Sequence, residues 1–234
     1  KDFIQSVKPS DFEKLIDKEH TSIPNRSIAL FTLSSIHKGT MELLKDSTLS
    51  TKEQLELIKK EDKLAAAFVL LSQGTPFMNG GQDFLRTKKG NPDSYSADTK
   101  GGIKWTNEPG EHNIDDVNTI DLSMKATYSD VYNVYKGLIS LRKANPDAFG
   151  KNTSAVAGKA KTINAEKEVK TNGVTKYTTG DFRIFFNATD DEVEIASGEM
   201  TGYTKVIDVT SGTPEESTTV PTSVPAKSFV ILKK

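Results

Sequence analysis

The side chains best suited to chemistry follow a pair of glycines. Asp83 and Arg86 come directly after the segment Asn79-Gly80-Gly81-Gln82, in which the glycines indicate a turn. Arg86 could orient Asp83 or donate hydrogen bonds to a substrate hydroxyl group. Both residues can also be explained without any ligand. Asp83 could cap backbone amides in the turn, and Arg86 could form a surface salt bridge of little energetic worth. Both interpretations stay open at the level of these residues.

Aromatic side chains are spread through the long polar stretch from Gln82 to Asn118. Structureless stretches of this length are unusual in compact domains and are often functional. Phe84, Tyr95 and Trp105 offer flat apolar faces of the kind on which sugars stack, although such rings also fasten loops to their own domain.

Composition excludes several other kinds of site. The chain has no cysteine, so disulfides, thiolate zinc sites and cysteine nucleophiles are excluded. Its three scattered histidines make a histidine metal site improbable, and His37 is more typical of a structural hydrogen bond than of a general base. We predict no cofactor. Calcium stays open, but acidic pairs such as Asp115-Asp116 are more typical of turns.

Charge and hydropathy constrain the partners and the compartment. The 31 Lys and Arg against 32 Asp and Glu are scattered and give a net charge of −1, so nucleic acid is not an expected partner. No apolar run reaches the ~18 residues of a membrane span, and we see no secretory signal. A second half rich in Ser, Thr, Lys and Asn favours an extracellular or cell-surface protein, with the cytoplasm as the alternative.

Helical spacing dominates the first 150 residues. Ser50 and Glu53 form a capping box for a long helix that ends at Ser72, before Gly74. A short strand is predicted over residues 75–78 and a second long helix over residues 127–144. An apolar run over residues 28–33 predicts a buried strand, and a short helix is expected over residues 11–19. This order is typical of an α/β layer.

After Gly150 the pattern changes to β-branched alternation. Strands are predicted over residues 174–178, 182–187, 192–196, 203–209 and 229–232, with an exposed connection over residues 210–225. The second half is therefore predicted to be a small antiparallel β domain, with domains at residues 1–150 and 151–234.

Four segments together resemble type I pullulanases, the α-glucan debranching enzymes of glycoside hydrolase family 13. The segment LLSQGTPFMNGGQDFLRTKKG, residues 70–90, is similar to the last barrel strand and the following loop of that family. DSYSADTKGGIKW resembles its next loop, YKGLISLRKANPDAF the helix that closes the barrel, and VPAKSFVIL the last strand of its C-terminal β-sandwich. The resemblance covers about residues 55 to 234.

The resemblance implies both a fold and an activity. The fold is the C-terminal portion of a (β/α)8 barrel followed by a small antiparallel β-sandwich. The activity is retaining hydrolysis of α-1,6-glucosidic bonds by two carboxylates ~5 Å apart. In the family those acids lie upstream of the matched segments. Alignment at Thr40 places Ile36 and His37 where the family has a histidine and its third acid. We therefore expect this chain alone to lack catalytic residues and to be inactive.

The substrate-binding residues implied by the resemblance are Asp83, where the family usually has Glu, with Arg86, Tyr95 and Trp105. The implied partners are α-glucans such as pullulan, starch and glycogen, together with the N-terminal barrel half. Asp93, Gly101 or Gly102, and Lys104 depart from the family pattern and weaken the inherited glucan contacts. Two alternatives remain, a non-catalytic carbohydrate-binding module and a structural module that retains only the fold.

Overall fold

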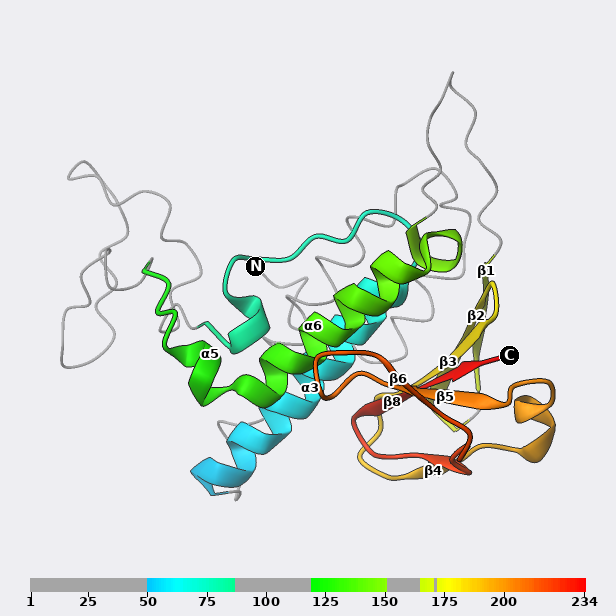
Figure 1. The fold of residues 1–234 in the computed structure, drawn as a ribbon. Helices are drawn as coiled ribbons and strands as arrows, with labels where there is room; N and C mark the ends of the chain where they lie inside the picture. Colours follow the sequence, from blue (N-terminus) through cyan, green and yellow to red (C-terminus); the bar gives the residue numbers. More distant parts are fainter. Residues whose placement is uncertain (1–49, 87–118, 151–164, 171) are drawn as a thin grey trace, which may run out of the picture. The chain divides into compact units, whose positions relative to one another are not determined.

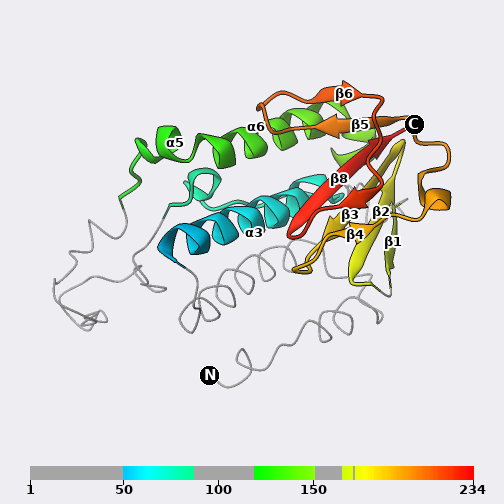
Figure 2. The same cartoon turned by 90° about the horizontal axis from the view of Figure 1, so that it is seen from below.

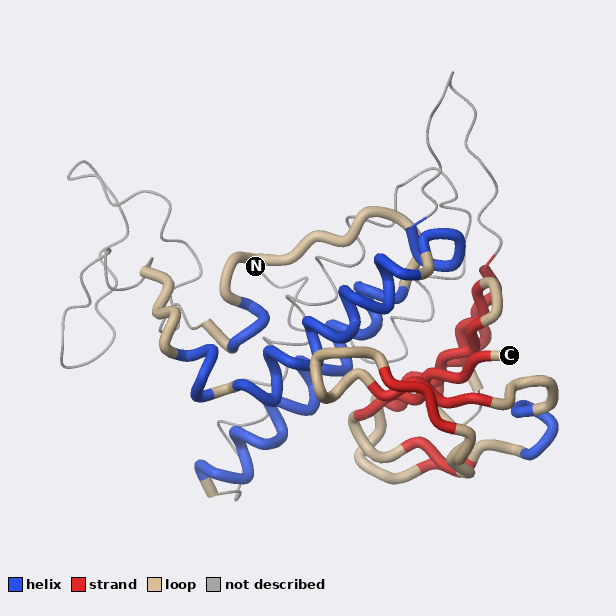
Figure 3. The backbone as a smooth tube through the Cα atoms, in the orientation of Figure 1, coloured by secondary structure: helices blue, strands red, loops and turns tan. Residues whose placement is uncertain are grey.

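The computed structural model describes residues 50–86, 119–150, 165–170 and 172–234 of the chain (Figure 1). The described residues form two compact units. The larger unit contains the residues up to Phe77 and those from Asn133 onward, and the smaller contains Met78 to Tyr132. In the larger unit, helices pack against an antiparallel sheet (Figure 3).

Helix α3 (Thr51–Leu71) begins with the predicted capping box. The Ser50 amide donates to the Glu53 carboxylate over 2.8 Å, and the Glu53 amide donates to the Ser50 hydroxyl over 3.4 Å. These bonds satisfy amides that a helix start leaves without partners. The C-terminal half of α3 is buried on nearly all sides, through Leu64, Ala65, Ala66, Ala67, Val69, Leu70 and Leu71.

Arg142 of helix α6 (Ser129–Ala144) closes the other end of α3. Its guanidinium donates to the Leu70 carbonyl over 2.6 Å, to the Ser72 carbonyl over 2.7 Å, and to the Gly74 carbonyl. A helix end leaves its last carbonyls without partners, and a cation there also favours the helix dipole. Arg142 therefore caps α3 while joining it to α6.

The two long helices lie side by side and run in the same direction (Figures 1 and 2). Tyr135, near the start of α6, donates to Asp62 over 3.2 Å, whereas Arg142, near its end, reaches Leu70. Successive helices joined by a short loop would run in opposite directions. The parallel direction therefore requires a long return connection between them.

The sheet of the larger unit has six strands in the order β1-β2-β3-β8-β5-β6, and every pair is antiparallel. A separate antiparallel pair joins β4 to β7. The strands of both sheets are β1 (Ala165–Val169), β2 (Val174–Thr179), β3 (Phe182–Asn187), β4 (Val193–Glu194), β5 (Lys205–Asp208), β6 (Glu215–Ser217), β7 (Ser223–Val224) and β8 (Ser228–Lys233).

An aromatic pair and the buried residue Gln73 fasten helix α3 to the sheet. The rings of Phe68 on α3 and Phe186 on β3 have centroids 5.0 Å apart. Gln73, directly after α3, donates to the Thr179 hydroxyl over 3.0 Å and to the Ala148 carbonyl over 3.2 Å. The backbone N–H of Gln73 also donates to the Tyr177 hydroxyl over 3.2 Å. Ala148 lies in a single turn of π-helix, Pro146–Gly150.

The structure confirms most elements predicted after residue 150 and both long helices. β2, β3, β5 and β8 lie within one or two residues of the predicted bounds, while the predicted strand over residues 192–196 shortens to β4. The prediction of a connection over residues 210–225 was wrong in part, because β6 and β7 lie there. β1 was missed, since its sequence AEKEV has no apolar alternation.

The strand predicted over residues 75–78 was wrong, because these residues are coil. A strand forms only where another strand supplies matching backbone groups, and all ladders of the described residues lie between Ala165 and Lys233. The apolar run at residues 28–33, the helix at residues 11–19 and His37 lie outside the described residues. The antiparallel β region is thus observed, whereas the barrel portion and the boundary at residue 150 stay predictions.

None of the described helices is both long and apolar enough to cross a bilayer.

At Gly137, helix α6 comes close to the backbone of Val209 in the β region. A Cβ atom added there would lie 2.9 Å from the Val209 Cβ and 3.0 Å from its carbonyl carbon. We expect Gly137→Ala to lower the free energy of unfolding by about 1 to 3 kcal/mol, because overpacking against backbone outweighs the better helix propensity of alanine. Urea unfolding of both proteins measures the difference.

Gly198→Ala is the matched control, because an added Cβ would meet nothing within 4 Å and its backbone has no positive φ. A Gly137→Ala variant as stable as the Gly198→Ala variant would contradict this account of the packing.

Candidate functional site

The glycine turn of the smaller unit fixes the backbone that carries Asp83 and Arg86. Gly81 has a φ of 87°, in the left-handed region that favours glycine, and it precedes the 3-10 helix η1 (Gln82–Phe84). A Cβ at Gly81 would lie 2.8 Å from the Arg86 Cβ, so Arg86 packs directly over this residue. Glycine at position 81 is therefore required by both the turn and the close contact.

Hydrogen bonds hold the turn closed. The Arg86 amide donates to the Gly81 carbonyl over 3.0 Å, and the Arg86 guanidinium donates to the Gly80 carbonyl over 3.4 Å. The Asn79 amide donates to the side chain of Gln82 over 3.3 Å. Phe84 is buried, and the neighbouring Asp83 and Arg86 are half-buried. Arg86 thus holds the turn closed. This role differs from both roles left open by the sequence, a substrate contact and a surface salt bridge.

Lys125 is a site residue that sequence reasoning missed. It lies on the short helix α5 (Met124–Thr127), with its ammonium 5.5 Å from the ring centroid of Phe84 and 5.4 Å from that of Tyr132. Both distances fit a cation over an aromatic face. α5 packs on η1, so Lys125 fastens the helix that bears Asp83 to its neighbour. A single lysine between Met124 and Ala126 gave no sequence signal for this contact.

The segment before α5 is itself held by a local bond. The Ser123 amide and hydroxyl donate to the Asp121 carboxylate over 2.9 and 2.6 Å. These hydrogen bonds, the one from the hydroxyl above all, lower the pKa of Asp121. Tyr95 and Trp105, the other two predicted binding residues, lie outside the described residues. Asp83 and Arg86 therefore share one turn, and the grouping of all four residues stays a prediction.

The turn offers one carboxylate and one guanidinium. Such a pair can accept from and donate to sugar hydroxyl groups. Among the residues that the structure describes, no group of three or more His, Asp or Glu side chains could hold a metal ion.

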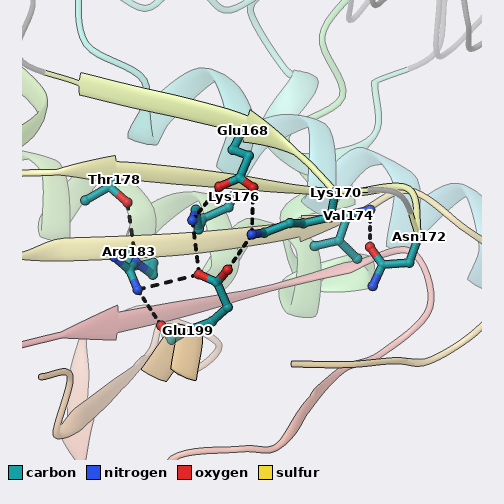
Figure 4. Close-up of polar contacts among 8 residues, drawn as sticks. All are labelled: Glu168, Lys170, Asn172, Val174, Lys176, Thr178, Arg183 and Glu199. Carbon is teal, nitrogen blue, oxygen red and sulfur yellow. Dashed lines mark hydrogen bonds and ion pairs between the residues drawn. The ribbon is translucent and has the colours of Figure 1, made fainter. Parts of the chain in front are cut away.

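A second polar cluster lies on the β region, and we call it the ion network (Figure 4). It comprises Glu168 on β1, Lys170, Lys176 on β2, Arg183 on β3, and Glu199 on the 3-10 helix Ser197–Met200. Lys170 bridges Glu168, over 2.8 Å, and Glu199. Lys176 also contacts both carboxylates, over 2.5 Å and 3.0 Å, and Arg183 lies 3.7 Å from Glu199.

The network shifts the ionisation of its carboxylates. Hydrogen bonds from Lys170 and then Lys176 lower the pKa of Glu168 to about 2. The same donors, Lys170 first, lower the pKa of Glu199. The network joins β1, at an edge of the sheet, to the segment around Glu199, so it closes one end of the β region.

Known proteins resemble this chain over part of their length. No protein-family model matches the sequence. A segment of 88 residues, 38% of this chain, is 35% identical to the pullulanase of Bacillus subtilis (strain 168) and covers 10% of that protein.

Solved structures show the same relation. The GBS pullulanase SAP in complex with maltotetraose matches 79% of this chain with a TM-score of 0.56 and 20% identity. The Paenibacillus barengoltzii pullulanase, in complex with maltohexaose and α-cyclodextrin, matches 80% with a TM-score of 0.53 and 22% identity. This chain covers 29% and 26% of those chains, so the likeness establishes a shared fold over a minor part of each.

Lys125→Met should loosen the glycine turn, because it keeps the length of the side chain but removes the charge that faces Phe84 and Tyr132. We expect a loss of about 0.5 to 1 kcal/mol in unfolding free energy, with NMR shifts at the amides of Gln82 to Arg86. Lys125→Arg keeps the cation and should restore both. Unchanged amide shifts in Lys125→Met would refute the fastening role.

Acid should weaken the ion network. A carboxylate whose folded pKa is depressed adds stability above its unfolded pKa, here about 4.5, and loses that contribution as the pH falls toward the folded value. We expect Glu168→Gln/Glu199→Gln to be less stable than the native chain at pH 7, with the difference shrinking between pH 4.5 and 2. Urea unfolding across that range measures it.

The control for this series is Glu215→Gln, since Glu215 is exposed on β6 of the same sheet. It should leave a pH profile parallel to that of the native chain. A stability gap that stays constant down to pH 2 in the double variant would count against the ion network as the source.

Proposed function

We propose, from the premise that this chain is a homologue of the pullulanases over part of their length, that it forms the C-terminal portion of an α-glucan debranching glycoside hydrolase. The observation that carries the proposal is the 35% identity over 88 residues with the Bacillus subtilis pullulanase. The shared fold with two pullulanases solved with maltooligosaccharides supports it. The complete enzyme would hydrolyse α-1,6-glucosidic bonds.

The direction of the helices supports a barrel origin for the first half. In a (β/α)8 barrel each strand is followed by a helix, so successive helices run in the same direction. The contacts of Asp62 with Tyr135 and of Leu70 with Arg142 give α3 and α6 that relation. We propose that they are two outer helices of such a barrel and that the connection between them carries the glucan-facing loops.

The glycine turn would form one wall of the glucan cleft. Asp83 and Arg86 lie on a backbone fixed by Gly81 and by the contact of Phe84 with Lys125. A fixed backbone reduces the entropy lost when hydroxyl groups are bound. Tyr95 and Trp105 would add stacking surfaces from the segment that follows. In this proposal the β region stabilises the barrel, and the protein works outside the cell or on its surface.

Hydrolysis by this chain alone is not expected. Ile36 and His37 stand where the resemblance places a histidine and an acid, and a neutral imidazole cannot replace a carboxylate beside a developing oxocarbenium ion. This departure also favours a second candidate function, a non-catalytic module that binds α-glucan through the same residues. The N-terminal barrel half would be the partner only in the first case.

Affinity electrophoresis tests the feature that both candidates share. We expect immobilised glycogen or pullulan to retard the chain, and Trp105→Ala and Asp83→Ala to reduce that retardation at least about tenfold in affinity, because stacking and hydroxyl contacts are lost. Leu122→Ala is the control, since Leu122 is 63% exposed and is not a predicted contact. A chain that no α-glucan retards would be a structural module.

Pullulan hydrolysis separates the two candidates. The purified chain should release no reducing sugar, and turnover by the chain alone would overturn the inactive assignment. Mixed with the N-terminal barrel half of a pullulanase, a His37→Asp variant should recover debranching if the chain is an enzyme portion. A mixture that binds glucan but stays inactive would favour the binding module.

A further inference from the structure

The dipeptide Asn-Gly occurs twice in the chain, at Asn79-Gly80 and at Asn172-Gly173. Asparagine is a chemically labile residue, because the backbone nitrogen of the next residue can attack its side-chain carbonyl carbon. Glycine in the next position has no Cβ to obstruct that approach. Both asparagines are exposed, so water reaches both sites. The hydrogen bonds at each site therefore decide which one reacts in the folded protein.

Hydrogen bonds restrain Asn172-Gly173, which lies in the turn between β1 and β2. The Gly173 N–H donates to the Lys170 carbonyl over 3.0 Å, so the attacking nitrogen is engaged. The Asn172 side-chain oxygen accepts from the Val174 N–H over 3.4 Å, which holds the group that would be attacked (Figure 4). Attack at Asn172 would first have to break both of these bonds, and each one adds to the barrier.

Asn79-Gly80 lacks such restraints. In the part of the chain that the structure describes, neither the Gly80 N–H nor the Asn79 side chain takes part in a hydrogen bond. The main chain of Asn79 is nevertheless fixed. Its N–H donates to the Gln82 side chain over 3.3 Å, and its carbonyl accepts from the Gln82 N–H over 3.1 Å. The turn thus holds the backbone and leaves the reacting side chain and nitrogen available.

We propose that Asn79 is a site of spontaneous deamidation and that the folded protein reacts there faster than at Asn172. The Gly80 nitrogen gives its proton to solvent base and bonds to the Asn79 Cγ. The Cγ–Nδ2 bond breaks, and Nδ2 takes a proton from water and leaves as ammonia. Water then opens the cyclic imide. Opening at Cγ gives aspartate, and opening at the main-chain carbonyl gives isoaspartate, whose main chain runs through Cβ and Cγ.

Either product changes the glycine turn. A new carboxylate enters the turn that carries Asp83 and in which the Arg86 guanidinium donates to the Gly80 carbonyl over 3.4 Å. In isoaspartate the carbonyl that accepts from the Gln82 N–H no longer belongs to the main chain, so the turn loses a backbone bond. The reaction requires neither glucan nor the N-terminal barrel half, so its test is independent of the proposed function.

Peptide mass spectrometry tests the proposal on the full chain incubated in mildly alkaline buffer. We expect the tryptic peptide with Asn79 to gain about 1 Da at least about tenfold faster than the peptide with Asn172, because only the second site must first break hydrogen bonds. In urea, where both sites are unfolded, the two rates should become similar. Equal rates in the folded protein, or a difference that persists in urea, would overturn the proposal.

Glycine variants test the route of attack. A Cβ added at Gly80 would lie 3.4 Å from the Ile120 Cδ1, an ordinary contact, and the Gly80 backbone has no positive φ, so alanine fits there. The added methyl group of Gly80→Ala should slow deamidation at Asn79 at least about tenfold. Gly198→Ala, where a Cβ meets nothing within 4 Å, should leave the rate unchanged.

Asn79→Ser removes the reacting carboxamide and should abolish the mass gain of its peptide. A mass gain that persists in Asn79→Ser would place the reaction at another residue and refute the site. A Gly80→Ala variant that reacts as fast as the native chain would refute attack by the Gly80 nitrogen.

Discussion

The packing of the larger unit depends on the contacts made by the segment at the C-terminal end of α3. Arg142 donates to three carbonyls between Leu70 and Gly74, and Gln73 bonds to Thr179 and Ala148 in the same short segment. A second helix, a strand and a helical turn thus converge on five residues. The half-buried guanidinium is tolerated there because carbonyl oxygens replace the water it loses. The exit of α3 is therefore the point at which the helices and the sheet are joined.

Local chemistry in the sequence predicted much of this fold. The Ser50 and Glu53 pair, the apolar spacing of α3 and α6, and the alternation in β2 and β3 each act over a few residues, so one sequence suffices to find them. β1 and β6 could not be found in this way. Their sequences are charged, and their pairing is imposed by β2 and β5. The strand predicted at residues 75–78 fails for the opposite reason. A sequence with a strand pattern forms no strand unless another strand pairs with it.

In the candidate site, too, the sequence predicted the local feature and missed the long-range contact. The double glycine correctly indicated a tight turn, because only glycine readily adopts the left-handed backbone of Gly81. The contact of Lys125 with two rings brings together residues 84, 125 and 132, and no short motif encodes a contact across that separation. The resemblance to pullulanases supplied the functional hypothesis, and the structure added how the backbone of Asp83 is held in place.

Among the residues that the structure describes, the six-stranded sheet ends at β1 and β6. Unpaired backbone groups at a sheet edge can recruit a strand from another molecule and start aggregation. Each of these strands carries a carboxylate held between two lysines, Glu168 between Lys170 and Lys176 and Glu216 between Lys205 and Lys233. A second strand docking there would have to desolvate or break these ion pairs. The charged edges thereby oppose growth of the β region into fibrils.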